Sequence, residues 1–322
     1  MVKLLMSLMI AVYILYFSIF SVLRYQKMQA NYFDLGIMHQ GVYNSYQAVR
    51  TGDWNRFLEI TDPIGPNQIN RMAVHNDPLL ALFVPFYFIS PSPIWLLIIQ
   101  SIVLGLGAFA VFGISNHVLK NTKNVSFISL LFALCYLLYF PMQYANRFDF
   151  HAVVLSTSFL LFMFYFWLVK NYRWSFVFLI LSLISKEQVG LTTAMMGVYM
   201  LAIQNLKSKV QNYNSKLKTL KYPISVILVS VVWVALSFFV IIPYFRGAEH
   251  FASSRYENIN VISTLFREST YRYFWFLLGP LGFLSLFSPI HLLIAAPEFV
   301  INLLSQESNM RNIVFHYTSV IQ

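Results

Sequence analysis

Charged side chains are scarce in this chain of 322 residues. They make up 11% of it, against a hydrophobic fraction of 58% and a mean hydropathy of +0.63. Soluble globular domains are about 25% charged and closer to half apolar. The composition therefore argues against an ordinary soluble domain and predicts a polytopic membrane protein.

Cysteine is almost absent, since Cys135 is the single one and stands inside an apolar run. One cysteine excludes an internal disulfide framework and a cysteine-type metal site. We therefore interpret Cys135 as a small buried apolar side chain. The sequence also lacks a Walker loop, a dinucleotide-binding glycine motif, a nucleophile elbow and a zinc-protease helix, so none of those enzyme classes is indicated.

The net charge of +10 could suggest a nucleic-acid partner, but the position of the lysines indicates another reason. Residues 205–222 contain five lysines and no acidic residue. Such a segment is typical of a cytoplasmic loop under the positive-inside rule. We therefore predict no nucleic-acid binding.

The first long apolar run, residues 4–23, is interpreted as an uncleaved membrane span. It follows Lys3, is longer than the core of a signal peptide and lacks a small-residue cleavage site. We expect the N-terminus in the cytoplasm.

Residues 24–93 are expected to form a loop on the outer side, because basic and acidic residues balance there. Apolar residues recur in the loop at helical spacing and predict a helix lying in the membrane interface. These residues are Leu35, Met38, Val42, Tyr46 and Val49. Residues 62–67 predict a turn-rich loop. Residues 78–89 are too short to cross about 30 Å of hydrocarbon comfortably, so they form either a short span or an interfacial segment.

The later apolar runs predict an all-α, polytopic transmembrane bundle of about nine spans, which forms one membrane domain over residues 1–322. They cover residues 94–114, 125–140, 153–169, 174–204, 222–242, 274–287 and 290–304. Lys186 and Glu187 stand in the middle of the run 174–204. Since an ion pair at mid-bilayer is costly, we interpret this run as two short spans that meet at an outer turn. We prefer the topology in which residues 78–89 do not cross, because it puts the lysine-rich segment in the cytoplasm.

In that topology the other ionisable side chains gather on the outer membrane face. They include Asp34, His75, Arg147, Asp149, His151, Lys186, Glu187, Arg255, Arg272 and His316. Ionisable groups in an apolar bundle are a functional-site hypothesis by default. We expect these residues to share one site.

Asp34 directly follows the first span and is the leading candidate for catalysis. It could act as a general base or as a metal ligand at the membrane surface. The alternative is that Asp34 caps the helix that follows, which is a common role for aspartate. The sequence leaves both interpretations open.

Two histidines have an acidic residue two positions away. Asp149 and His151 would face one side only in an extended chain. Metal binding, a proton relay, phosphate binding and simple capping by Asp149 all remain open. His75 and Asp77 could equally form a turn before a membrane segment. A divalent metal ion is a candidate cofactor with Asp34, Asp149 and His151 as candidate ligands, although no local signature identifies the metal.

Basic residues on the same face are candidates for binding phosphate. Lys186 would attract a phosphate while Glu187 binds or polarises an acceptor; alternatively, the two side chains pair or reach up to the interface. Arg147, Arg255 and Arg272 could hold phosphate oxygens through paired hydrogen bonds, or they could be snorkelling interfacial residues.

Several short motifs, taken in order, resemble a known family. They are Phe33-Asp34-Leu35-Gly36 with Gln40, His75 with Pro78 and Leu79, Phe148-Asp149-Phe150-His151, Lys186-Glu187, Pro243 with Arg255-Tyr256, Pro297-Glu298, Asn302-Leu303-Leu304-Ser305 and His316-Tyr317. Their order and spacing are similar, over nearly the whole chain, to the prokaryotic membrane proteins of domain of unknown function 2079. That family in turn looks like a branch of the GT-C glycosyltransferases.

The resemblance implies an inverting glycosyltransferase in the plasma membrane that takes a sugar from a polyprenyl-phosphate donor outside the membrane. In GT-C enzymes an acidic residue in the first outer loop serves in catalysis, and Asp34 is the matching position. Asp34 and Glu187 are therefore the predicted catalytic residues. The predicted substrate-binding residues are His75, Arg147, Asp149, His151, Lys186, Arg255, Tyr256, His316 and Tyr317. Because family members normally continue with further spans, we expect this chain to be C-terminally truncated.

A polytopic transporter or lipid flippase, with ionisable residues along its substrate path, is the alternative function. The long outer loop with its interfacial helix favours the transferase. Transporters also often contain two related halves, and no internal repeat is found in this sequence. The expected partners are the lipid-linked sugar and membrane lipids, and the sequence does not identify the acceptor.

Overall fold

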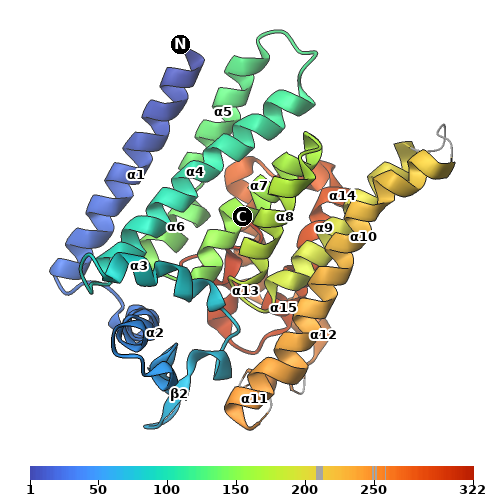
Figure 1. The fold of residues 1–322 in the computed structure, drawn as a ribbon. Helices are drawn as coiled ribbons and strands as arrows, with labels where there is room; N and C mark the ends of the chain where they lie inside the picture. The colour runs from blue at the N-terminus through green and yellow to red at the C-terminus, as the bar shows by residue number, and fades with distance from the viewer. Residues whose placement is uncertain (208–212, 249, 251, 258) are drawn as a thin grey trace.

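The computed structural model describes residues 1–207, 213–248, 250, 252–257 and 259–322, and this part of the chain is mostly helical. The expected all-α class is confirmed, with one small hairpin as its β structure within the described residues. Long helices share a common direction, and shorter segments fill the space between them (Figure 1). The lysine-rich segment predicted to face the cytoplasm covers residues 205–222. Residues 208–212 of this segment lie outside the described residues.

Three helical segments are long and apolar enough to cross a membrane within the described residues. They are α1 (Val2–Gln26), α4 (Ile94–Val118) and the continuous stretch Leu220–Arg246. A fourth is available if α5 (Val125–Leu138) and α6 (Phe140–Phe148) count as one span bent by 42°. Helix length alone therefore supports three or four spans, and the other expected spans are shorter apolar helices.

The long stretch Leu220–Arg246 is built from most of α10 (Tyr213–Leu236), η6 (Ser237–Ile241) and α11 (Ile242–Arg246). The remaining helices complete the bundle. They are η4 (Ala152–Leu155), α7 (Ser156–Leu168), α8 (Tyr172–Leu183), α9 (Val189–Lys207), η7 (Ser253–Tyr256), α12 (Val261–Leu265), α13 (Glu268–Leu278), η8 (Gly279–Leu281), η9 (Leu284–Phe287), α14 (Pro289–Leu292), η10 (Leu293–Ala295), α15 (Ala296–Leu304), η11 (Ser308–Arg311) and η12 (His316–Thr318). The expected break in the run 174–204 is present between α8 and α9. It leaves Lys186 and Glu187 in a turn outside both helices.

The first loop contains the expected helix, α2 (Tyr32–Thr51), which Figure 1 shows nearly end-on while α1 runs across the view. Its residues Leu35, Met38 and Val42 are buried, as the helical spacing predicts, whereas Val49 is exposed. After η1 (Trp54–Arg56), strands β1 (Glu59–Thr61) and β2 (Gln68–Asn70) pair antiparallel. The turn-rich loop expected at 62–67 joins the two strands.

The segment 78–89 forms two short pieces, η3 (Pro78–Phe83) and α3 (Val84–Tyr87), which follow η2 (Arg71–Ala73). Both pieces pack on α2, at the same end of the bundle as the hairpin (Figure 1). At 1.5–2 Å per residue a segment of this length spans less than the roughly 30 Å of hydrocarbon. This arrangement fits an interfacial segment.

A π-helical turn, η6, interrupts the last long span between α10 and α11. Ser237 in this turn donates a hydrogen bond to the Trp233 carbonyl at 2.7 Å. It also accepts one from the side chain of Asn76 at 2.8 Å. The irregular turn is thereby tied to the loop that carries His75.

Close contacts between helices depend on small residues. A Cβ added at Gly190 in α9 would lie 2.5 Å from Val234 Cγ2 and 3.1 Å from the Ser230 carbonyl in α10. Glycine therefore lets the two backbones approach, as is common between membrane helices. Cys135 lies on the exposed face of α5, so the expectation that it is buried is wrong. In a membrane bundle an apolar face can point toward lipid as well as toward the core.

Candidate functional site

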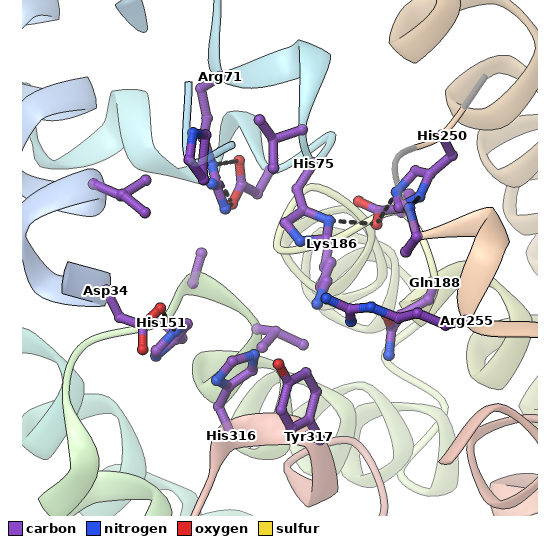
Figure 2. Close-up of a pocket in the computed structure, with 18 of the residues that line it drawn as sticks. Asp34, Arg71, His75, His151, Lys186, Gln188, His250, Arg255, His316 and Tyr317 are labelled. Carbon is purple, nitrogen blue, oxygen red and sulfur yellow. Dashed lines mark hydrogen bonds and ion pairs between the residues drawn. The ribbon is translucent and has the colours of Figure 1, made fainter. Parts of the chain in front are cut away.

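A cavity of about 630 Å³ lies at the end of the bundle that carries α2 and α11. Its walls come from the loop between α1 and α4, the segment after α6, the α8–α9 turn, the loop after α11 and the segment that follows α15. The predicted site residues that line it are Asp34, His75, His151, Lys186, Glu187, Arg255, Tyr256, His316 and Tyr317. The expected convergence of these residues is thus present in the structure (Figure 2).

Asp34 lies in the first turn of α2 with a side chain 28% exposed. The residue that caps the helix is Asn31, so the interpretation of Asp34 as the N-cap is wrong. The amide of Asn31 instead donates a long hydrogen bond of 3.4 Å to Oδ2 of Asp34. Oδ1 lies 3.8 Å from Nε2 of His151. The carboxylate of Asp34 therefore stands at the cavity wall beside an imidazole and is still reached by solvent.

His151 and His316 stack with ring centroids 3.6 Å apart, although 164 residues separate them in the sequence. Burial lowers the pKa of both imidazoles, and each ring also faces nearby positive charge from Lys186. Both rings are therefore neutral near pH 7. The Nδ1 atoms of both rings are buried and have no hydrogen-bond partner among the described residues. Buried polar atoms are rarely left unsatisfied, so each of these two nitrogens can bind an ordered water or a polar group of a ligand. We call Asp34, His151 and His316 the Asp34 cluster.

Asp149 does not line this cavity. The residue is extended, and its carboxylate is buried near Asn31, Arg24 and Asp34. Burial raises the pKa of Asp149 to about 7, despite a backbone hydrogen bond from Asn31. Capping by Asp149 is not seen, since the residues at the N-cap positions of η4 and α7 are His151 and Leu155.

The segment that carries Asp149 and His151 is held by Gln100 in α4. Nε2 of Gln100 donates to the Asp149 carbonyl at 3.0 Å, and Oε1 accepts from the backbone N–H of His151 at 3.1 Å. The amide thus replaces the hydrogen bonds of a neighbouring strand and fixes His151 in extended backbone. Sequence reasoning missed Gln100; the signal was a single amide within an otherwise apolar span.

Two arginines proposed to bind phosphate lie away from the cavity. The guanidinium of Arg147 stands 4.8 Å from the ring centroid of Phe20, and the carbonyl of Arg147 accepts a hydrogen bond from Arg24. Arg272 is exposed and pairs with Glu268 one helical turn away. Both positions fit the alternative interpretation, an interfacial residue.

Glu187 is 2% exposed and is surrounded by donors. Nδ1 of His75 lies 2.8 Å and Nε2 of His250 lies 3.5 Å from its Oε1, while the backbone N–H of Asn76 donates to Oε2 at 2.9 Å. Burial alone would raise the pKa of Glu187, but the interactions with His75 and His250 and the charge of Lys186 hold it well below the usual range. Burial also lowers the pKa of His75 to about 3, so its ring is neutral. We call His75, Glu187 and His250 the Glu187 cluster.

Lys186 and Arg255 lie between the two clusters and extend toward the same part of the cavity (Figure 2). The ammonium of Lys186 stands 5.9 Å from the ring centroid of Tyr317, and Tyr317 and Arg255 both line the cavity beside it. The hydroxyl of Tyr256 donates to the Ile301 carbonyl at 3.3 Å, which ties this wall to α15. The middle of the cavity is therefore cationic, with an accessible carboxylate on one side.

A buried ion pair supports the loop that carries His75. Nη2 of Arg71 lies 2.7 Å from Oδ2 of Asp77, and Nε of Arg71 donates to both carboxylate oxygens at 3.0 and 3.1 Å. The carbonyl of Arg71 also accepts from the backbone N–H of His75 at 3.1 Å. This part of the loop is thus fixed by charge and by backbone contacts.

The proposed metal candidates Asp34, Asp149 and His151 do not form a set of three close ligands. In the described part of the chain, the group of three side chains whose ligand atoms all lie within 4.8 Å of one another is the Glu187 cluster. Sequence reasoning missed His250 and the site role of Arg71. Neither belongs to a local motif, so only the folded chain brings them to the cavity.

A family model described as "Predicted membrane protein (DUF2079)" matches residues 24–322. The chain belongs to this family. The match extends over the loop between α1 and α4 and every wall of the cavity, and it confirms the resemblance of the sequence motifs to domain of unknown function 2079. No curated protein and no solved structure matches the chain. The cavity described here is therefore a candidate site for the DUF2079 fold that rests on its own geometry.

Proposed function

We propose that this DUF2079 protein is a GT-C-like membrane glycosyltransferase. It would move a sugar from a polyprenyl-phosphate donor to an acceptor at the outer membrane face. The observation that carries the proposal is one cavity, at one end of a membrane bundle, whose lining includes a solvent-reached carboxylate, Asp34, and the cations Lys186 and Arg255. A lipid phosphate needs the cations, and an acceptor hydroxyl needs the base.

In the proposed reaction Asp34 is the general base. The acceptor oxygen attacks the anomeric carbon of the donor sugar and its proton passes to Asp34. The bond from that carbon to the phosphate oxygen breaks at the same time, and its electron pair leaves with the lipid phosphate. Lys186 and Arg255 stabilise the negative charge on the departing phosphate. A single displacement of this kind inverts the anomeric configuration.

The two unpartnered imidazole nitrogens of His151 and His316 support a polar substrate at this place. A sugar carries many hydroxyl groups that donate and accept hydrogen bonds, and neutral imidazoles suit both roles. Glu187 is assigned a positioning role, because its oxygens are already engaged and almost no solvent reaches it. This assignment gives different roles to the two carboxylates that the sequence predicted to be catalytic.

We also propose nine membrane crossings in the plasma membrane, with the N-terminus in the cytoplasm. The N-terminus, the α4–α5 connection and the first described turns of α10 lie at one end of the bundle in Figure 1, opposite α2 and α11. Single cysteines at exposed Thr122 and Asn55, introduced in a Cys135→Ala background, test this topology. An impermeant thiol reagent should label position 55 from outside and position 122 only after permeabilisation; the reverse pattern would overturn the proposed topology.

The activity is tested by reconstitution with radiolabelled polyprenyl-phosphate sugars and membrane extracts as the source of acceptor. Asp34→Asn should lower sugar transfer by roughly 10²–10⁴-fold, the usual contribution of a general base. Asp53→Asn is the matched control, because Asp53 belongs to the same loop, is exposed and does not line the cavity.

Two results would reject the proposal. Equal transfer by wild type and Asp34→Asn would remove the proposed base. Translocation of lipid without any sugar transfer would favour the alternative, a transporter or flippase.

A further inference from the structure

The Glu187 cluster has the spacing of a metal site. His75, Glu187 and His250 each offer one ligand atom, and these atoms all lie within 4.8 Å of one another. Two of the separations, from Oε1 of Glu187 to the two imidazole nitrogens, are 2.8 and 3.5 Å. Ligand atoms at 2.0–2.1 Å around a tetrahedral Zn²⁺ ion are about 3.3 Å apart. Small shifts of these three side chains would therefore bring their ligand atoms to coordination distance from one ion.

We propose that His75, Glu187 and His250 bind a Zn²⁺ ion whose fourth coordination position faces the cavity. Two imidazoles and one carboxylate are the donor set of many catalytic zinc sites, which keep one position open. The hard cations Mg²⁺ and Ca²⁺ prefer sites built from oxygen ligands, so this set favours zinc over them. All three residues line the cavity, so the open position is accessible from it.

The surroundings of the cluster hold the ligands in place. The backbone N–H of Asn76 donates to Oε2 of Glu187 at 2.9 Å. Oε1 faces both imidazole nitrogens, so it is the oxygen that would bind the ion in place of its present contact with Nδ1 of His75. The side chain of Asn76 is itself fixed by Ser237 in the π-helical turn. Partners of this kind orient metal ligands and contribute strongly to affinity. They connect the cluster to both the first outer loop and the last long span.

The charge around the cluster indicates what the open position would bind. Zn²⁺ with one carboxylate carries a net positive charge, and Lys186 and Arg255 add two more on the same side of the cavity. An anion such as a phosphate oxygen would neutralise this charge. The role of the ion as a ligand for the donor phosphate rests on the proposed function, whereas zinc binding itself does not.

Zinc binding is tested directly on the purified full chain. The protein is treated with a chelator, and Zn²⁺ is then titrated while metal content is measured by mass spectrometry. One Zn²⁺ per chain is expected, with no comparable binding of Mg²⁺. Co²⁺ in the same site should give the visible absorption bands of a four- or five-coordinate ion, and Zn²⁺ should displace them. An absorption spectrum typical of six-coordinate, solvated Co²⁺ would overturn the proposal.

Variants then assign the ligands. Glu187→Gln and His250→Ala should each weaken zinc binding by roughly 100-fold or more, because loss of an outer partner alone costs 10–100-fold. His316→Ala is the matched control for zinc affinity, since His316 lines the same cavity but lies outside the cluster. Unchanged affinity in Glu187→Gln, or equal loss in His316→Ala, would overturn the proposed ligand set. The elution volume and circular dichroism of each variant verify that it is folded.

The outcomes also separate this inference from the proposed function. If the protein binds one Zn²⁺ per chain but transfers no sugar, the proposed metal site is supported and the proposed transferase activity is rejected. If the protein binds no zinc but transfers sugar in a way that depends on Asp34, the transferase activity is supported and the metal site is rejected.

Discussion

The buried pair of Arg71 and Asp77 allows a quantitative test of how the cavity loop is held. Their side chains are 4% and 3% exposed, and the closest N–O distance is 2.7 Å. At an effective dielectric constant of about 20, unit charges about 3 Å apart attract by roughly 5 kcal/mol. Removal of one partner leaves a buried charge without its counter-ion and should cost about 3–5 kcal/mol of unfolding free energy.

The double replacement should behave differently. Because each ion also loses hydration on burial, replacing Arg71 and Asp77 together by Met and Leu should change stability by much less than the sum of the single changes. The cycle therefore predicts a coupling energy of about 3 kcal/mol or more. Reversible unfolding of the purified protein in mixed detergent micelles would measure the four members of the cycle.

The exposed pair of Glu268 and Arg272 is the matched control. It has the same 2.7 Å separation, but its side chains are 77% and 70% exposed. Solvent screening limits an exposed pair of this kind to a few tenths of a kcal/mol. If the buried pair showed coupling as small as the exposed pair, burial would not be the reason for its strength and the reasoning would be refuted.

Three further predictions concern other parts of the chain. Since Asp149 has a pKa of about 7 instead of 3.8, the native state binds more protons than the unfolded state between these values, and stability should fall as pH rises through that window. Asp149→Asn should flatten the dependence of Tm on pH between about 4 and about 7, and a slope equal to that of wild type would contradict the assignment. Gln100→Leu should lower the free energy of unfolding by about 1–3 kcal/mol, because the Asp149 carbonyl and the His151 N–H each lose a partner. Gln100→Glu keeps the size of the side chain, so it would show whether size without the amide donor keeps the protein as stable as wild type. Gly190→Ala should destabilise by roughly 1–3 kcal/mol through overpacking against Val234, and a neutral effect on Tm would show that α9 and α10 can separate at no cost.

Much of the fold could be predicted from hydrophobic runs. The first span, the helix in the first outer loop and the break around Lys186 all follow from apolar run length and spacing, because each is a local property of the chain. The turn at residues 62–67 follows equally from its prolines and glycine. These features agree with the structure in position.

The number of spans was harder to predict. The run at 274–304 is apolar, yet it folds into short pieces such as α13, η9 and α15 instead of long helices. Gly279, Gly282 and Pro289 interrupt this region, and Gly282 takes a left-handed conformation at φ 60°. Hydrophobicity indicates burial in lipid or protein but does not distinguish a spanning helix from packed shorter ones.

The site could be predicted in outline because charge is so rare in this chain. Nearly every ionisable residue assigned to the outer face could be expected to converge, and Asp34, His75, His151 and Lys186 do. The pairings within the site could not be predicted. His250 meets Glu187 across 63 residues of sequence, a distance that periodicity and motif spacing do not describe.

The π-helical turn at Ser237–Ile241 has a consequence for how the two ends of the last long span are oriented. A π turn accommodates one residue more than an α-helical turn, so the helix leaves it rotated by roughly 100° relative to uninterrupted α-helical geometry. The side chains of α10 can therefore pack against α9, while those of α11 take a separate angular register against η2 and β2. Deletion of one residue within the turn would restore continuous α-helical geometry from α10 to α11. The segment that bears His250 would then be rotated and would move away from Glu187.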